Sequence, residues 1–223
     1  MNDYSAARRN MVESQIRPNE VTDSRLVRAM LDVPREQFVP AALRPLAYME
    51  NEMVVGQGGA LHGERRLMAP MPQARLIQLA EIDANNLVLD IGCATGYSTA
   101  VMARMAESVV GLECDPVLAD VASQTLTELD VDNAAVVTGA LEEGYAAEGP
   151  FDAIVINGCD PDVPERLLKQ LQDGGRLVVI ISGGDFGQAT LFRNTGGRIS
   201  RRGAFDGGAP VLPGFEQEKT FVL

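Results

Sequence analysis

The spacing of hydrophobic residues changes near residue 86, and the change separates two kinds of segment. Before it, apolar residues recur mainly at helical spacing, with prolines and glycines between the segments. After it, short continuous aliphatic runs alternate with helix-like segments. Continuous aliphatic runs are typical of parallel strands that are buried on both faces. We therefore expect a helical and loop-rich extension over residues 1–80, packed on an α/β core over residues 81–223.

The extension is predicted to combine helices with irregular chain. The pattern indicates helices over 6–16 and 74–80, and a further helix whose first turn is capped by Thr22 or Asp23. A short apolar piece at 53–55 lies among glycine-rich turns. This extension is expected to pack on the core.

The core is predicted to alternate strands with helices that cover a parallel sheet. Strands are expected at 87–89, 109–112, 134–137, 151–156 and 176–181, and helices at 97–105, 116–129 and 163–171. The tail contains strand-like pieces at 189–192 and 220–223. Such an ending predicts antiparallel strands at one edge of the sheet.

The turn after the first aliphatic run carries the most informative pattern in the chain. Asp90 ends the run, and a loop of small residues with Gly92 and Gly96 leads into a helix-like segment. Small residues let the backbone approach a ligand, and Glu113, which ends the next run, can accept bonds from two ribose hydroxyls. This arrangement predicts a nucleoside site, although a plain strand–turn–helix without ligand remains an alternative. A dinucleotide is disfavoured because that fingerprint requires glycine where Ala94 stands.

The sequence resembles a large class of enzymes in one motif and a single family of that class over longer segments. The spacing Asp90-x-Gly92-x-Ala94-x-Gly96 resembles motif I of S-adenosylmethionine-dependent methyltransferases, whose usual form has glycine in place of Ala94. Three further segments resemble the protein-L-isoaspartate O-methyltransferase family, and the likeness extends to about residue 185. These segments are Met11-Val12-x-x-Gln15, Val33-Pro34-Arg35-Glu36-x-Phe38-Val39-Pro40 and Gly144-Tyr145-Ala146-x-x-Gly149-Pro150-Phe151-Asp152.

The resemblance implies a fold, a reaction and a cofactor. The implied fold is the Rossmann-like class I methyltransferase fold, with a mostly parallel, doubly wound sheet and antiparallel edge strands. The implied donor is S-adenosyl-L-methionine, which is converted to S-adenosyl-L-homocysteine. The implied reaction is methylation of the carboxylate of isoaspartyl residues in damaged proteins, so the partner would be a protein or peptide.

The same resemblance implies where the cofactor lies along the carboxyl edge of the sheet. The first loop supplies the floor of the site, the second strand end supplies the ribose and adenine contacts, and the fourth strand end flanks the methionine part. The implied cofactor-binding residues are Asp90, Gly92, Cys93, Ala94, Gly96, Glu113, Cys114, Ala140, Leu141, Asn157 and Gly158.

Two positions depart from the family pattern. Met68 stands where the family has a serine near the reacting carboxylate, and a thioether cannot donate a hydrogen bond. Ala140 replaces an acid that resembles an acceptor for the adenine amine, and Glu142 follows it closely. Two alternatives therefore stay open: a methyltransferase of this fold with another, small acceptor, and a non-catalytic protein that binds S-adenosylmethionine. His62 is the single histidine, and a lone histidine is more often a loop residue than a general base.

The amino-acid composition bears on which classes of partner and ligand the protein binds. The formal net charge is −12, from 31 acids and 19 bases, which disfavours a nucleic-acid partner because phosphate binding draws on basic patches. The three cysteines are odd in number and lack zinc spacing, so we expect reduced thiols and no metal. The longest purely aliphatic run, 177–181, is too short to span a bilayer. We expect a cytoplasmic protein with no membrane partner, whose oligomeric state the sequence does not specify.

Overall fold

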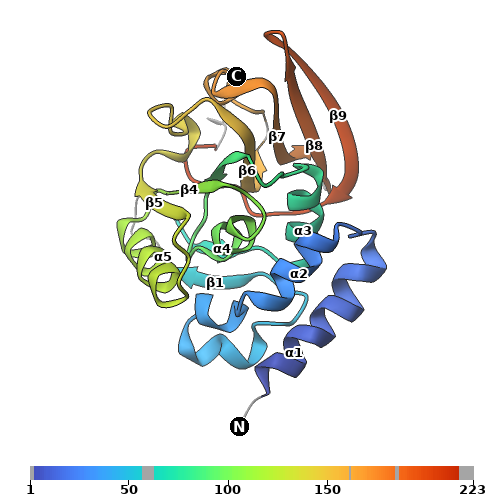
Figure 1. The fold of residues 1–223 in the computed structure, drawn as a ribbon, viewed down its shortest axis with the longest axis vertical. Helices are drawn as coiled ribbons and strands as arrows, with labels where there is room; N and C mark the ends of the chain where they lie inside the picture. Colours follow the sequence, from blue (N-terminus) through green and yellow to red (C-terminus); the bar gives the residue numbers. More distant parts are fainter. Residues whose placement is uncertain (1–2, 57–62, 161, 184–185, 216–223) are drawn as a thin grey trace, which may run out of the picture.

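The computed structural model describes residues 3–56, 63–160, 162–183 and 186–215. A seven-stranded sheet with the order β5-β4-β3-β6-β7-β8-β9 forms its centre (Figure 1). The strands of this sheet are β3 (Leu87–Ile91), β4 (Ser108–Glu113), β5 (Ala134–Thr138), β6 (Phe151–Asp160), β7 (Leu171–Gly183), β8 (Phe186–Thr195) and β9 (Arg198–Gly207). Strands β3 to β7 run parallel, and β8 and β9 pair antiparallel at one edge. The predicted mixed sheet is thus confirmed.

Helices cover both faces of this sheet. The α-helices are α1 (Tyr4–Met11), α2 (Ser24–Asp32), α3 (Pro70–Leu79), α4 (Tyr97–Ala103), α5 (Pro116–Glu128) and α6 (Glu165–Leu168). Shorter turns are the π-helical η1 (Val12–Ile16) and the 3-10 segments η2 (Arg17–Asn19), η3 (Arg35–Phe38), η4 (Ala41–Leu46) and η5 (Leu141–Glu143). Two short strands, β1 (Met53–Gly56) and β2 (Arg65–Leu67), pair with each other outside the main sheet.

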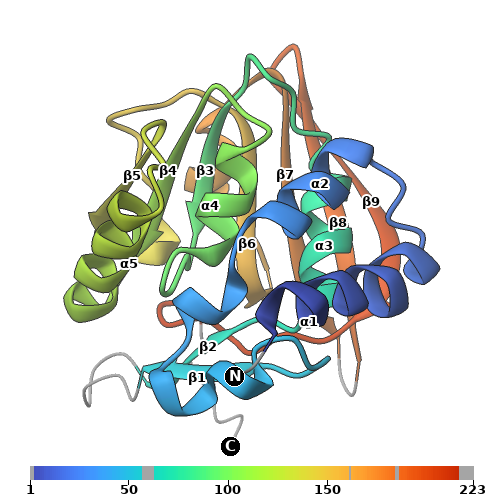
Figure 2. The same ribbon diagram turned by 60° about the horizontal axis from the view of Figure 1, so that its bottom comes forward.

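Alternation along each strand sends neighbouring side chains to opposite faces and so builds two hydrophobic clusters. Val88 belongs to the cluster that contains the side chains of α1 to α4, and Leu89 belongs to the other, which contains α6 and η5. Figure 2 shows α1 to α4 together on one side of the sheet. The first cluster draws on residues from both sides of residue 80, and the division into extension and core there stays a prediction.

One secondary-structure prediction was wrong, and one strand was not predicted. The helix expected over 163–171 is only the single turn α6, and Leu171 already begins β7, where it pairs with Phe151. The amide of Phe151 donates to the Gln170 carbonyl at 2.8 Å, so pairing with β6 takes over where the helix was expected to continue. Strand β9 was not predicted, because its arginines are exposed at the sheet edge and give no apolar signal. The piece at 220–223 lies outside the described residues.

The topology fixes where a ligand can bind. Strand β3 lies between β4 and β6, so the chain order reverses there, and ligands of open parallel sheets bind at the carboxyl ends of strands at such a switch point. No helix in the described ranges combines the length and apolarity that a bilayer crossing requires.

Candidate functional site

The loop between β3 and α4 adopts the backbone conformation that its small residues allow. Gly92, Ala94 and Gly96 have φ angles of 72°, 51° and 91°, all in the left-handed region. Glycine enters this region freely, whereas alanine does so at a cost of about 1–2 kcal/mol. The loop is also tightly packed, because a Cβ at Gly96 would lie 3.1 Å from the Ala122 Cβ on α5. The sequence therefore predicted correctly where a tight turn occurs.

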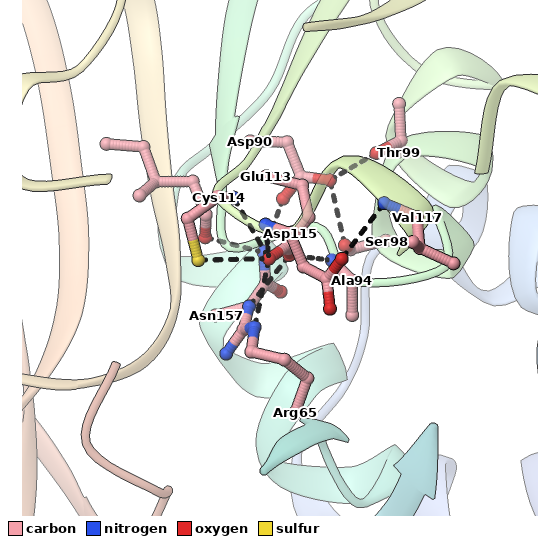
Figure 3. Close-up of polar contacts among 11 residues, drawn as sticks. Arg65, Asp90, Ala94, Ser98, Thr99, Glu113, Cys114, Asp115, Val117 and Asn157 are labelled. Carbon is pink, nitrogen blue, oxygen red and sulfur yellow. Dashed lines mark hydrogen bonds and ion pairs between the residues drawn. The ribbon is translucent and has the colours of Figure 1, made fainter. Parts of the chain in front are cut away.

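Asp90 ties three elements together beneath this loop. Its fully buried carboxylate accepts hydrogen bonds from Ser98 Oγ at 2.8 Å and Thr99 Oγ1 at 2.5 Å, both on α4. Asn157 Nδ2 of β6 donates to the other oxygen (Figure 3). Burial raises the pKa of Asp90 to about 6, although these three hydrogen bonds oppose the rise. With its oxygens engaged, Asp90 positions the loop.

A chain of buried polar groups continues from Asn157 into the N-terminal extension. Gln73 Nε2 donates to Asn157 Oδ1 at 3.2 Å, and Arg35 Nη1 donates to Gln73 Oε1 at 3.4 Å. Arg35 Nη2 donates to the Met68 carbonyl at 2.6 Å. The Met68 side chain is 1% exposed and belongs to the hydrophobic core. Its backbone is therefore coupled to the floor of the site, while its thioether packs away from solvent.

Glu113, the predicted ribose ligand, lies at the end of β4 and is fully buried. Its Oε1 accepts bonds from Arg65 Nε at 3.0 Å and from the amides of Cys114 and Asp115 at 3.0 and 3.2 Å. Its Oε2 accepts bonds from Arg65 Nη2 and the Ala94 amide, each at 2.8 Å (Figure 3). Two carboxylate oxygens offer about four acceptor positions, so these donors leave none for a ribose.

Arg65 belongs to the site but was not predicted from the sequence. It begins β2, is 1% exposed and forms a two-pronged ion pair with Glu113. Burial would lower the pKa of Arg65 and raise that of Glu113, but the pairing outweighs burial for both groups. The net result is a raised pKa for Arg65 and a lowered pKa for Glu113. No local pattern around residue 65 signals this contact, because its partner lies far along the chain.

Residues 210–215, here called the C-terminal strap, cross the carboxyl edge of the sheet. The Pro210 carbonyl accepts a bond from the Cys159 amide at 2.9 Å. Leu212 is 1% exposed, and its Cδ1 lies 2.9 Å from the Cβ position that Gly92 leaves empty. Its Cδ2 lies 2.8 Å from the corresponding position at Gly158. The two glycines therefore do admit a close neighbour, and that neighbour is Leu212.

The remaining predicted residues lie in the loops that follow β3, β4 and β5. Cys93 is buried, and burial raises the pKa of its thiol well above the ordinary range. Cys114 is half-buried beside Glu113, and burial together with the Glu113 charge raises its pKa to about 12. Both thiols are therefore protonated at neutral pH. Ala140 is exposed at the start of η5, and Leu141 is buried behind it.

Two other expectations concern His62 and metal ions. His62 lies outside the described residues. Within the described ranges, no group of three or more His, Cys, Asp or Glu side chains is arranged to hold a metal ion.

Comparison with known proteins identifies the family. The model of the protein-L-isoaspartate (D-aspartate) O-methyltransferase family matches residues 6–202. A protein-L-isoaspartate O-methyltransferase of Methanoculleus marisnigri is 37% identical over 171 residues, which cover 77% of this chain and 75% of the relative. One from Koribacter versatilis is 32% identical over 198 residues, which cover 89% and 86% of the two chains.

Solved structures show the same fold. A protein-L-isoaspartate O-methyltransferase superposes with a TM-score of 0.80 at 24% identity, over 93% of this chain and 66% of that one. A Plasmodium falciparum chain assigned to that family, in complex with S-adenosyl-L-homocysteine, gives 0.75 at 21% identity over 95% and 99%. These likenesses confirm the Rossmann-like methyltransferase fold. Because the family model spans most of the sequence and its relatives align over most of their length, the chain belongs to the protein-L-isoaspartate (D-aspartate) O-methyltransferase family.

Proposed function

We propose that this chain is an S-adenosylmethionine-dependent methyltransferase that methylates the carboxylate of isoaspartyl residues in proteins or peptides. The observation that carries the proposal is the family match over residues 6–202, together with relatives of that name at 32% and 37% identity. A cytoplasmic location is part of the proposal and is supported by the odd, widely spaced cysteines.

The framework of the site supports the same proposal. The loop from Gly92 to Gly96 lies at the switch point of the sheet, and Glu113 ends the neighbouring strand. The Asn157 side chain reaches the same point from β6. Close backbone approach and a carboxylate acceptor at neighbouring strand ends are typical of nucleoside sites in such sheets.

The acceptor chemistry demands little acid–base catalysis. A carboxylate with an ordinary pKa near 4 is already anionic at neutral pH and needs no base to become a nucleophile. The protein's contribution is then to orient the acceptor and to exclude water. A buried Met68 in place of a hydroxyl is compatible with such a site, because no proton has to be moved there.

The conformation described here does not fit the cofactor. The Glu113 oxygens are fully engaged by Arg65 and backbone amides. The space over Gly92 and Gly158 is filled by Leu212. A protein in this conformation therefore cannot carry out methyl transfer.

A transfer assay tests the proposal. The purified chain is incubated with methyl-labelled S-adenosylmethionine and either an isoaspartyl peptide or the matching aspartyl peptide. We expect a base-labile methyl ester on the isoaspartyl peptide alone. Equal labelling of both peptides, or labelling of neither, contradicts the proposal.

Two glutamates at opposite ends of one strand provide a matched pair of variants. Glu113→Gln alters the predicted ribose ligand and should abolish transfer. Glu107→Gln changes an exposed glutamate that precedes the amino end of β4, away from the carboxyl ends where the ligand is expected. It should leave transfer unchanged.

A further inference from the structure

We propose that Arg65 and the C-terminal strap form an intramolecular plug that occupies the cofactor crevice and must leave before S-adenosylmethionine binds. This inference rests on the proposed function and concerns how the same site is regulated. In this proposal, one part of the chain competes with the cofactor for the same site.

Arg65 competes for the predicted ribose ligand. Its Nε and Nη2 each donate to a different oxygen of Glu113, at 3.0 and 2.8 Å. The two hydroxyls of a ribose would address the same pair of oxygens, so guanidinium and sugar cannot bind Glu113 together. The ion pair also balances the charge of a carboxylate that is wholly removed from water. Arg65 therefore stabilises the closed crevice and excludes the nucleoside.

Leu212 competes for the space beside the ribose ligand. Its Cδ atoms lie 2.9 and 2.8 Å from the Cβ positions that Gly92 and Gly158 leave free. It also packs in the hydrophobic cluster with Ile91, Ile156 and Leu141, which come from three different elements at this edge. Leu212 thus fills the space that the two glycines leave free for a close neighbour.

The plug can detach without breaking the main sheet. Arg65 lies on the two-stranded β1–β2 sheet, which is separate from the seven-stranded one. In the part of the chain that the structure describes, the backbone of the strap meets β6 through the bond from the Cys159 amide to the Pro210 carbonyl and the bridge between Cys159 and Val211. When a binding-competent form is only partly populated, the apparent dissociation constant rises by the inverse of that fraction. Weakening the plug must therefore tighten cofactor binding.

Calorimetric titration with S-adenosyl-L-homocysteine tests this on the full chain. Leu212→Ser removes the apolar contact of the strap, and we expect its dissociation constant to fall about tenfold or more below that of the unmodified chain. Leu171→Ser is the matched control, because Leu171 is also a buried leucine of the same cluster but lies at the opposite end of the strands. Its affinity should equal that of the unmodified chain.

A second readout needs no ligand. Hydrogen exchange of the Cys159 amide, followed by NMR, reports whether its bond to Pro210 is formed. Exchange should be slow in the unmodified chain and about tenfold or more faster in Leu212→Ser. If Leu212→Ser does not fold, Arg65→Lys replaces it, since lysine keeps the charge but loses the two-pronged geometry. This variant should also bind the ligand more tightly.

The outcomes separate the two proposals. Equal, measurable affinity in the unmodified chain and in Leu212→Ser overturns the plug and leaves the proposed function standing. Tighter binding by Leu212→Ser together with faster Cys159 exchange supports the plug. No binding by either chain, although Cys159 exchanges faster in the variant, overturns the proposed function and with it a plug that serves to control cofactor entry.

Discussion

Removing Arg65 should expose how strongly the closed crevice depends on one ion pair. Both partners are at most 1% exposed, and breaking a buried ion pair by removing one partner costs about 3–5 kcal/mol. Glu113 keeps the amides of Ala94, Cys114 and Asp115 as donors, which offset part of its lost partner. We therefore expect Arg65→Met to lower the free energy of unfolding at pH 7 by about 3 kcal/mol, the low end of that range.

The cost of Arg65→Met should depend on pH. In the unmodified chain the pKa of Glu113 lies below its ordinary value, so its stabilising contribution is present above about pH 4.3 and is lost as the pH falls through the folded pKa. In the variant, burial acts on Glu113 without the opposing cation, and the folded carboxyl takes up a proton more readily than the unfolded one. The loss of stability in the variant should therefore shrink as the pH falls from 7 to 4.

Urea unfolding at pH 7 and pH 4.5 measures both effects. Glu113→Gln and the double variant complete a cycle that isolates the pair from other losses. Arg198→Met, at an exposed position on β9, is the control and should change stability by less than about 0.5 kcal/mol. A cost below about 1 kcal/mol for Arg65→Met, or an equal cost at both pH values, would refute the reasoning.

Three further substitutions probe the floor of the site and its neighbours. The folded pKa of Asp90, about 6, exceeds its unfolded value of about 3.9, so rising pH between these values should remove about 2–3 kcal/mol of stability from the unmodified chain relative to Asp90→Asn. Urea unfolding across pH 4–7 tests this, and parallel pH profiles would contradict it. Gly96→Ala places a Cβ at φ 91° and 3.1 Å from Ala122, and thermal unfolding should show a loss of about 1–2 kcal/mol or more. An unchanged melting temperature would argue against the described turn. Met68→Ser should cost about 2–4 kcal/mol because the thioether is core, and a cost near zero would place that side chain at the surface instead.

The sheet was predictable because its central strands contain continuous aliphatic runs, as at residues 87–89 of β3, whose burial leaves a local trace in the sequence. Strand β9 leaves no such trace, since its exposed arginines give no apolar run and its place in the sheet follows from the ladder with β8. The shortening of α6 also escaped prediction. It follows from the pairing of Phe151 with Leu171, which joins two strands rather than neighbouring turns.

The residues of the candidate site were likewise predictable only in part. The turn at Gly92–Gly96 and the carboxylate of Glu113 follow from residue types at strand ends, so local sequence was enough to locate them. Arg65 and Leu212 reach Glu113 and Gly158 from distant parts of the chain, and neither has a local pattern that marks it. The structure brings the predicted residues to one edge of the sheet, and their contacts with a cofactor stay predictions.

A crystal structure of the full chain with S-adenosyl-L-homocysteine tests most directly whether Glu113 is the ribose ligand of this family member. The account predicts both ribose hydroxyls on the Glu113 carboxylate, with Arg65 withdrawn and Leu212 displaced from Gly158. A nucleoside bound elsewhere, with the pair between Arg65 and Glu113 intact, would contradict it.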